Sequence, residues 1–417
     1  EEMAHNAREM EREGLTIPLL IGGATTSRTH TAVKIAPHYS GPVIWVPDAS
    51  RSVSVCSNLL SDGLRAGYLK DVQAEYERVR EQHAGKKGPE LITLEAARAN
   101  ALKTDWAGYA PPRPEMRGVK LLKNYDLAEI AEHIDWGPFF QTWELSGPFP
   151  AILQDPVVGE AARNVHAEGR AMLKKIIEGR WLKANAVFGL FPAASVNHDD
   201  IEIYGDESRA RPLMTWHNLR QQNAKPTGNP NLCLADFIAP KASGARDYIG
   251  AFAVTAGIGI EKKLAEFEKR HDDYSAIMLK ALADRLAEAF TELLHKRVRR
   301  EFWGYGRDEG LDNAALIAEK YRGIRPAPGY PACPDHTEKG ALFDLVNARR
   351  AGIELTESYA MHPASSVSGF YFSHPHSQYF AVGRLARDQV ADYARRKGMP
   401  LADAERWLAP YLGYDRQ

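Results

Sequence analysis

The sequence predicts two parts of different fold class: the end of a doubly wound α/β domain, then an α+β domain with a mainly antiparallel sheet. The first prediction rests on short, wholly apolar runs that alternate with helical patterns, as in strands buried on both faces of a parallel sheet. The second rests on strands at hairpin-scale spacing among longer helices. With 417 residues, the chain is also too long for one core, so about two or three domains are expected.

The first part covers residues 1–88. Residues 2–13 predict an amphipathic helix that ends at Gly14, and the apolar run at 17–21 predicts a strand buried on both faces. The other predicted elements are a helix from the caps Thr25, Thr26 and Ser27 to about Ala36, a strand at Val43–Val46, and helices from Asp48 to about Leu60 and over 64–83. Too few strands are present for a whole domain, so we expect the C-terminal half of one, in a piece of a longer chain.

The carboxyl ends of these two strands carry the positions where a ligand of such a sheet would bind. Gly22 and Gly23 follow the first strand, and Asp48-Ala49-Ser50 follows the second. After this part, residues 89–115 are polar and contain four prolines. We therefore predict an interdomain linker there, with a helical turn or two near Leu94–Leu102.

The second part, residues 116–417, mixes helices with alternating or aromatic-rich strands. The predicted helices lie at about 126–133, 157–179, 261–270, 272–302, 309–320, 339–351, 386–397 and 401–408. The predicted strands are Ala186–Phe191, Asp200–Tyr204, Arg211–His217, Tyr248–Thr255, Ser366–Ser373 and Tyr379–Val382, the last two forming a hairpin. Gly257-Ile258-Gly259 lacks the third glycine of a dinucleotide-binding fingerprint, so it predicts no such site.

Composition excludes several classes of protein. The net charge of −1 and pI near 7 give no basic excess for nucleic acid as the main partner. Cys56, Cys233 and Cys333 are far apart and show no CxxC spacing, which indicates a reducing compartment and neither a disulfide framework nor a zinc site. No apolar run reaches transmembrane length, and the N-terminus lacks the layout of a signal peptide.

The stretch RPAPGYPACP at residues 325–334, the proline-rich loop, is the main candidate for a binding site. Its prolines exclude a helix interior or a central strand and leave a stiff, extended backbone. Arg325, Gly329 and Tyr330 add a cation, a point of conformational freedom and an aromatic ring, a combination suited to a small zwitterion. A proline-rich surface connector is the alternative.

Two other segments could complete such a site. Asp135 stands among aromatic residues and turn formers, either as a binder of an ammonium group or as a turn aspartate. Tyr379 and Phe380 end an aromatic segment and form either a core or a wall against a planar ligand. His374 and His376 have no matching Cys or acid nearby, which disfavours a metal site.

The long helix at 272–302 carries two carboxylates, Asp284 and Glu288, at the edge of its apolar stripe. They belong either to a solvated face or to a surface that meets a partner domain. His336 and His362 have no recognisable nucleophile partner, and no nucleophile elbow, Walker loop or HExxH motif is present. The residues alone therefore indicate a ligand-binding protein of two domains, without an evident acid/base catalyst.

The whole chain resembles the C-terminal part of the cobalamin-dependent methionine synthase family. The segments that carry the resemblance are Ile17–Thr31 (IPLLIGGATTSRTHT), Asp135–Phe140, Val187–Tyr204, Leu234–Thr255, Arg325–Lys339 (RPAPGYPACPDHTEK), Ser366–Pro375 and Glu405–Asp415. The resemblance implies that residues 1–88 are the end of a Rossmann-like cobalamin-binding domain. It implies that residues from about 116 are the activation domain, which binds S-adenosylmethionine.

The resemblance also assigns site residues. S-adenosylmethionine contacts are implied for Asp135, Arg325, Ala327, Gly329, Tyr330, Tyr379 and Phe380, and cobalamin contacts for Gly22, Gly23 and Ala49. The cobalt-ligating His would lie upstream of Glu1, and zinc belongs to domains outside this chain, as do the folate and homocysteine sites. No metal ligand and no catalytic residue is implied within this chain.

The implied activity is that of a methyltransferase, which moves a methyl group from 5-methyltetrahydrofolate to homocysteine through cobalamin. This piece would support the reductive remethylation of inactive cob(II)alamin, with an electron from flavodoxin or a related reductase and a methyl group from S-adenosylmethionine. The implied partners are that reductase and the upstream domains of the same enzyme, in the cytoplasm, with neither nucleic acid nor membrane. One alternative is a docking module for the cobalamin domain and reductase. Another is an ordinary small-molecule methyltransferase, whose expected Gly-rich strand-to-helix turn is missing.

Overall fold

The structure of the chain, a computed structural model, describes residues 2–22, 26–46, 49–85 and 90–416, with the backbone alone for 49–51 and 83–85. The chain divides into two compact units, Glu1–Glu90 and Leu91–Gln417. Each unit has hydrophobic clusters of its own.

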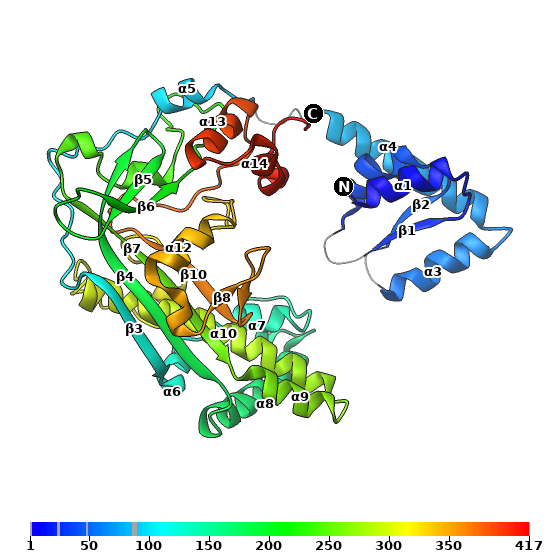
Figure 1. Cartoon of the computed structure of the whole chain (residues 1–417). Helices are drawn as coiled ribbons and strands as arrows, with labels where there is room; N and C mark the ends of the chain where they lie inside the picture. The colour runs from blue at the N-terminus through cyan, green and yellow to red at the C-terminus, as the bar shows by residue number, and fades with distance from the viewer. Residues whose placement is uncertain (1, 23–25, 47–48, 86–89, 417) are drawn as a thin grey trace. The chain divides into compact units, whose positions relative to one another are not determined.

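The first unit contains a pair of parallel strands flanked by helices (Figure 1). Its elements are α1 Glu2–Arg12, β1 Leu19–Gly22, α2 Arg28–His30, β2 Val43–Val46, α3 Ala49–Leu60 and α4 Arg65–Gly85. Ser27 caps α2, because its hydroxyl accepts a hydrogen bond from the His30 amide at 3.1 Å. The order of helices and strands agrees with the sequence-based expectation.

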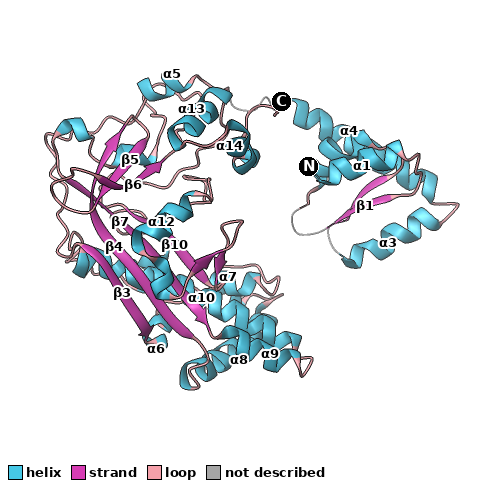
Figure 2. Ribbon diagram, in the orientation of Figure 1, coloured by secondary structure: helices cyan, strands magenta, loops and turns pink. Residues whose placement is uncertain are grey.

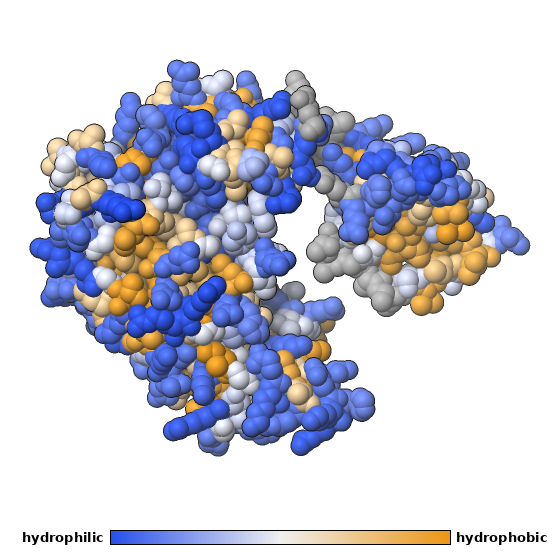
Figure 3. All heavy atoms as spheres, viewed as in Figure 1, coloured by the Kyte–Doolittle hydropathy of each residue, from blue (hydrophilic) through white to orange (hydrophobic). Residues whose placement is uncertain are grey.

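One expectation for this unit is wrong, because β1 is not buried on both faces. Leu20 is 37% exposed, whereas Ile21 is buried. In the described residues β1 pairs with β2 alone, and nothing described in this unit covers the side of the strand that carries Leu20. Other exposed apolar side chains of the unit include Ile17, Val53 and Leu60. Figure 3 shows apolar side chains gathered on its visible face.

The second unit is built on an antiparallel sheet with helices packed around it (Figures 1 and 2). Among the described residues the sheet has six strands in the order β10-β7-β4-β5-β6, with β3 also paired to β4. The strands are β3 Gly118–Tyr125, β4 Lys183–Val196, β5 Asp200–Tyr204, β6 Pro212–His217, β7 Asp247–Ile258 and β10 Ser366–Tyr371, and a separate pair is formed by β8 Glu354–Leu355 and β9 Met361–His362. This architecture confirms the predicted α+β class with a mainly antiparallel sheet.

The helices of this unit enclose both faces of the sheet. They are α5 Leu94–Ala99, α6 Leu127–Ala131, α7 Gly137–Gln141, α8 Gly159–Glu178, α9 Ile260–Glu268, α10 Asp273–Arg297, α11 Asn313–Ile317, α12 Glu338–Val346, α13 Arg387–Lys397 and α14 Leu401–Trp407. A π-helical turn, Val298–Phe302, extends α10. Alternate residues of β7 point to opposite faces: Phe252 and Val254 join one apolar cluster, with α8 and α10, while Ala251 and Ala253 join another, with α12.

Two local predictions for this unit need correction. Residues 379–382 form no strand, so the predicted hairpin with Ser366–Ser373 is wrong, although its turn exists, because Ser377 N donates to the carbonyl of His374 at 3.1 Å. β10 pairs with β7 instead, and the backbone of Val382 bonds to the carbonyl of Pro331 at 2.8 Å. The short strand β3 and helix α7 were not predicted, and α11 is much shorter than the predicted 309–320.

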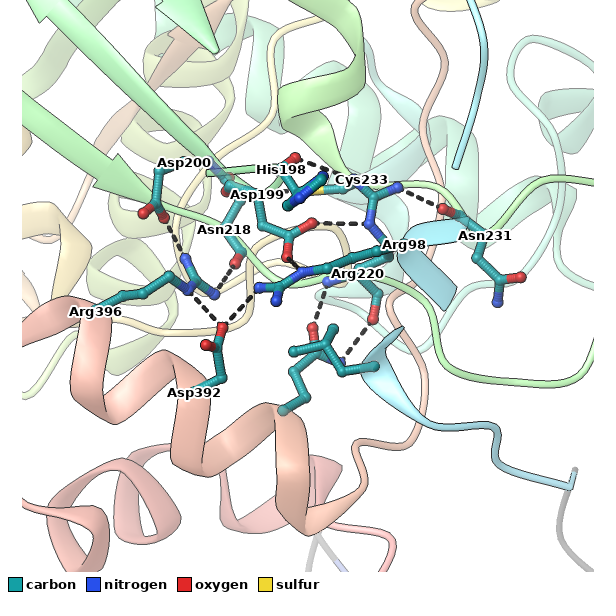
Figure 4. Close-up of polar contacts among 12 residues, drawn as sticks. Arg98, His198, Asp199, Asp200, Asn218, Arg220, Asn231, Cys233, Asp392 and Arg396 are labelled. Atoms are coloured by element: carbon teal, nitrogen blue, oxygen red, sulfur yellow. Dashed lines mark hydrogen bonds and ion pairs between the residues drawn. The ribbon is translucent and has the colours of Figure 1, made fainter. Parts of the chain in front are cut away.

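The sequence predicts a linker at residues 89–115. In the structure the second unit begins at Leu91, so most of the predicted linker is part of that unit. Its expected helical turn is α5, and Arg98 on that helix donates to Asp199 and Asp392, each at 2.7 Å. Figure 4 shows this arginine within a network of ion pairs around Arg220. Further along, Trp303 Nε1 donates to the carbonyl of Pro112 at 2.8 Å. Proline-rich composition therefore marks an extended segment here, and ion pairs attach it to the unit.

Candidate functional site

The proline-rich loop closes on itself between α11 and α12. Gly329 N donates to the carbonyl of Cys333 at 2.8 Å. Gly329 has a φ of +96°, and a Cβ at this position would overlap the ring of His336. Phe370 N donates to the carbonyl of Pro326 at 2.9 Å, which ties the loop to β10. These contacts make the loop a fixed part of the unit, in contrast to a loose surface connector.

A cavity of about 610 Å³, the loop cavity, lies beside this loop. Its volume is in the range of roughly 300–1,000 Å³ that is typical of small-molecule sites. Five residues predicted from sequence line it: Arg325, Ala327, Tyr330, Tyr379 and Phe380. The structure thus brings together two segments that are separate in the sequence.

Arg325 makes its side-chain contacts through one terminal nitrogen among the described residues. Nη1 donates to the Tyr321 hydroxyl at 2.6 Å and to Nδ1 of His295 at 3.2 Å. It also lies 2.8 Å from Oε2 of Glu292. The backbone amide of Arg325 donates to the Tyr379 hydroxyl at 3.0 Å. In the described part of the chain, Nε and Nη2 of this guanidinium have no hydrogen bond, and the side chain keeps 19% exposure beside the cavity.

The electrostatics of this cluster keep Arg325 charged and His295 neutral. Burial alone would lower the pKa of Arg325, but the Glu292 carboxylate beside it raises that pKa above its ordinary value. Burial, together with Arg299 and Arg325, lowers the pKa of His295 well below its ordinary value. Because arginine is only a donor, Nδ1 of His295 must be the acceptor in their hydrogen bond.

One face of α10 supplies most of the polar groups near the cavity. Asp284, Glu288, Glu292 and His295 recur at three- or four-residue spacing, so they lie on the same side of the helix. Glu288 lines the cavity, and Asp284 accepts a hydrogen bond from the Ser365 hydroxyl at 2.6 Å. The sequence predicts that Asp284 and Glu288 lie either on a solvated face or on a surface that meets a partner domain. In the structure, Glu288 lines the candidate site.

Asp135 lies in a second, adjoining cavity of about 310 Å³. The two cavities share Glu288, Glu319 and Arg325 in their walls. Oδ1 of Asp135 also accepts a hydrogen bond from Gly137 N at 2.9 Å, as a turn aspartate does. Both interpretations of this residue are thus compatible with its position at the edge of the site.

The cavity wall includes residues that the sequence analysis did not identify. Thr291 comes from α10, Phe252 from β7 and Glu319 from the segment after α11. Thr291 and Glu292 continue the polar row from Glu288, and this spacing could have indicated them. Nothing in the sequence pattern distinguishes Phe252 from an ordinary core residue.

Other sequence-based candidates lie elsewhere. The ring of His374 packs against Trp106 and Tyr109, at centroid distances of 5.1 and 4.9 Å. No group of three or more His, Cys, Asp or Glu in the described residues is arranged to hold a metal ion. The described helices include none with the length and apolar character needed to cross a membrane.

In the first unit, Gly22 is the last residue of β1 and pairs with Val46 at the end of β2. Gly23 lies outside the described residues. Ala49 is the first residue of α3, and its side chain is not described. The two strands are parallel, so their carboxyl ends meet at one edge, as the sequence predicts.

Comparisons with known proteins agree with one another. A family model described as "Vitamin B12 dependent methionine synthase, activation domain" matches residues 126–398. A solved structure entitled "Crystal Structure of the MetH Reactivation Domain bound to AdoHcy" has 54% sequence identity and a TM-score of 0.76. That match covers 79% of this chain and 100% of the solved one.

Proposed function

Because the chain belongs to the family of vitamin B12 dependent methionine synthase activation domains, we propose that its loop cavity binds S-adenosylmethionine for reactivation of the enzyme's cobalamin. The observation that carries this proposal is the convergence of Arg325, Tyr330 and Tyr379 on one cavity of about 610 Å³. A relative with 54% identity has been solved with AdoHcy, the demethylated form of the same ligand.

The groups around the cavity match the ligand's chemistry. The unused Nε and Nη2 of Arg325 form a fork that suits the methionyl carboxylate. Asp135 and Glu288 lie where they can accept hydrogen bonds from the α-ammonium group. Tyr379 and Phe380 offer aromatic and apolar surface to the adenine ring, and the proline-rich loop adds backbone groups at Ala327.

The chemistry asked of this chain is positioning. Transfer of a methyl group from a sulfonium needs an in-line approach and no proton shuttle. The cobalamin of the enzyme, when bound, supplies the cobalt that accepts the methyl group. The side chains described here bind the methyl donor and fix its orientation, which agrees with the lack of an evident acid/base catalyst in the sequence. The methyltransferase activity therefore belongs to the multidomain enzyme, and this chain contributes to its maintenance.

We further propose that residues 1–88 are the end of a Rossmann-like cobalamin-binding domain and that 116–417 are the activation domain. Supporting the first assignment, a Cβ at Gly22 would lie 3.2 Å from the carbonyl of Val46, so glycine lets the strand ends approach closely. Gly22, Gly23 and Ala49 are the proposed contacts to cobalamin, with Ala49 at the cofactor's tail. Flavodoxin or a related reductase, in the cytoplasm, is the proposed electron donor.

Calorimetry with S-adenosylmethionine tests the main proposal. We expect the wild-type chain to bind, and Arg325→Ala to weaken binding by about 1.5–3 kcal/mol, the range for hydrogen bonds to charged groups. Arg349→Ala, at an exposed arginine outside both cavities, is the matched control and should bind as the wild type does.

The outcomes also separate the alternatives. Absence of binding by the wild type would overturn the proposal and favour the docking module, which needs no ligand of its own. Methyl transfer to a small substrate without cobalamin would favour the ordinary methyltransferase. Equal loss in both arginine variants would show that the effect is nonspecific.

A further inference from the structure

The contacts of Arg325 are unevenly distributed over its guanidinium. Three groups surround Nη1: the Tyr321 hydroxyl at 2.6 Å, Oε2 of Glu292 at 2.8 Å and Nδ1 of His295 at 3.2 Å. Of these, the hydroxyl and the imidazole have the geometry of hydrogen-bond acceptors, and the carboxylate adds charge compensation. The two hydrogens of Nη1 are therefore both engaged.

This arrangement selects one edge of the guanidinium for a ligand. Arginine has five N–H groups in a fixed plane, and the hydrogens of Nε and Nη2 point in parallel along one side. A carboxylate binds such a side edge through two parallel hydrogen bonds. With Nη1 engaged, this Nε–Nη2 edge of Arg325 is the part left for a ligand in the loop cavity.

The two acceptors are themselves held in place. The His295 ring stacks on Tyr371 with centroids 5.0 Å apart and an interplanar angle of 10°. It meets the edge of Tyr321 at 4.9 Å, and the Arg299 guanidinium lies 4.1 Å from the centre of the Tyr321 ring. His295 and Tyr321 are both buried. Because both rings are held, neither acceptor can move with Arg325 if the guanidinium turns. Each hydrogen bond therefore favours one orientation of the guanidinium.

We propose that His295 and Tyr321 are positioning residues, which hold Nη1 of Arg325 so that its Nε–Nη2 edge faces the carboxylate of S-adenosylmethionine. The inference rests on the proposed function. It requires His295 to be neutral, with its hydrogen on Nε2, because Nδ1 accepts from an obligatory donor. Glu292 compensates the charge of Arg325 in this arrangement, and the two neutral acceptors fix its direction.

The test compares two ligands on the full chain by calorimetry. One is S-adenosylhomocysteine, and the other is the same molecule with its carboxylate replaced by hydrogen. In the wild type we expect the carboxylate to improve affinity by about 10–100-fold, as for hydrogen bonds to a charged group. Arg325→Ala should reduce this ratio to near unity.

The positioning residues are then changed one at a time. His295→Phe keeps the stacked ring without an acceptor, and Tyr321→Phe removes only a hydroxyl. Each should reduce the affinity ratio by about fivefold, the usual effect of one hydrogen bond. His295→Asn restores an acceptor oxygen near the position of Nδ1, and should recover most of the ratio. Affinity for the ligand without a carboxylate should stay unchanged in all of these variants.

The possible failures are distinguishable. If the wild type binds neither ligand, the proposed function is wrong. If it prefers the carboxylate but Tyr321→Phe and His295→Phe leave the ratio unaltered, the positioning inference is wrong and the function stands. Equal weakening of both ligands would assign the two residues a structural role and would also overturn the inference. Thermal unfolding of each variant identifies a folding defect, in which case Tyr321→Phe, the smaller change, decides.

Discussion

Two arginines of the second unit, Arg220 and Arg325, differ in how many of their N–H groups the protein engages in hydrogen bonds. Arg220 has a side chain 1% exposed, and five hydrogen bonds engage its N–H groups. Their acceptors are the carboxylates of Asp199 and Asp236 and the backbone carbonyls of His198 and Asn231. Arg325, at 19% exposure, engages only Nη1 among the described residues.

The difference separates a structural arginine from one that is available to a ligand. Buried polar groups in folded proteins are nearly always hydrogen-bonded, as those of Arg220 are, whereas Nε and Nη2 of Arg325 stay available to a ligand at the cavity wall. Through Asp199, the residue before β5, the network of Arg220 reaches Arg98 on α5, and through Arg98 and Asp392 it reaches α13 (Figure 4). Both guanidinium groups are paired with buried carboxylates, so the pattern of hydrogen bonds and the greater exposure of Arg325 tell the two sites apart.

The largest expected effect comes from Arg220→Met. It leaves the carboxylate of Asp236 buried without its cation and leaves Asp199 with Arg98 alone, and breaking a buried ion pair costs about 3–5 kcal/mol. Chemical denaturation should show that loss of stability. Under conditions where the variant is still folded, its affinity for S-adenosylhomocysteine should match that of the wild type.

Arg406→Met is the control for this change, because that side chain is 65% exposed and pairs with Asp403 at the surface. Its effect on stability should stay within about 1 kcal/mol. An Arg220→Met variant no less stable than the control would contradict the structural role of the network.

At Arg325 the second prediction is the opposite, because ligand binding should be affected more than stability. Arg325→Met should abolish carboxylate-dependent binding and cost about 1–3 kcal/mol of stability, because Glu292 is left buried without a cation. Adding Glu292→Met should recover part of the stability and none of the binding. Recovery of binding in the double variant would contradict the assignment of the ligand carboxylate to Arg325.

Much of the site could be predicted from sequence because its chemistry is concentrated in short segments. The proline-rich loop is conspicuous in composition, and it carries Arg325, Ala327 and Tyr330 together into the cavity wall. Tyr379 and Phe380 were also identified, although the predicted strand that bore them does not form. Aromatic, alternating residues fit a strand or an extended segment equally well, and here hydrogen bonds to the loop decide the outcome.

The parts that escaped prediction depend on tertiary pairing. Glu292 and His295 resemble other polar residues of a long helix until Arg325, thirty positions beyond His295, is placed beside them. The segment with Arg98 has the composition of a linker, and contacts with distant residues such as Asp199 and Asp392 make it part of the unit. Periodicity describes which face a residue occupies, but it carries no information on which partner arrives there.

A smaller effect on stability is expected from Arg98→Met. This change tests whether the ion pairs of Arg98 hold residues 91–115 in the second unit. Loss of two charge-assisted hydrogen bonds from a side chain 21% exposed should cost about 1–2 kcal/mol. It should also loosen residues 91–115, so limited proteolysis should cut within this segment faster than in the wild type. Unchanged cleavage would mean that other contacts, such as Trp303 to Pro112, suffice to hold the segment.

The smallest effect on stability concerns His374, a neutral residue. Its ring packs on Trp106 and Tyr109, which belong to the segment 91–115. Burial, with His376 and Arg322 nearby, lowers the pKa of His374 to about 4. In the unfolded chain the value is about 6.5, so the unfolded state takes up the proton first as the pH falls. The stability that this group contributes is therefore complete above about pH 6.5 and is lost progressively toward pH 4.

His374→Asn should flatten the pH dependence of unfolding free energy in that window, because its amide oxygen can accept from the His376 amide as Nδ1 does and cannot be protonated. Denaturation curves between pH 7.5 and 4 measure the slope, and the difference from the wild type isolates one imidazole. His271→Asn, at an exposed histidine, is the control and should keep the wild-type slope. Equal slopes in the wild type and His374→Asn would mean that the pKa of His374 is the same in the folded and unfolded states, and would contradict the effect of burial on this imidazole.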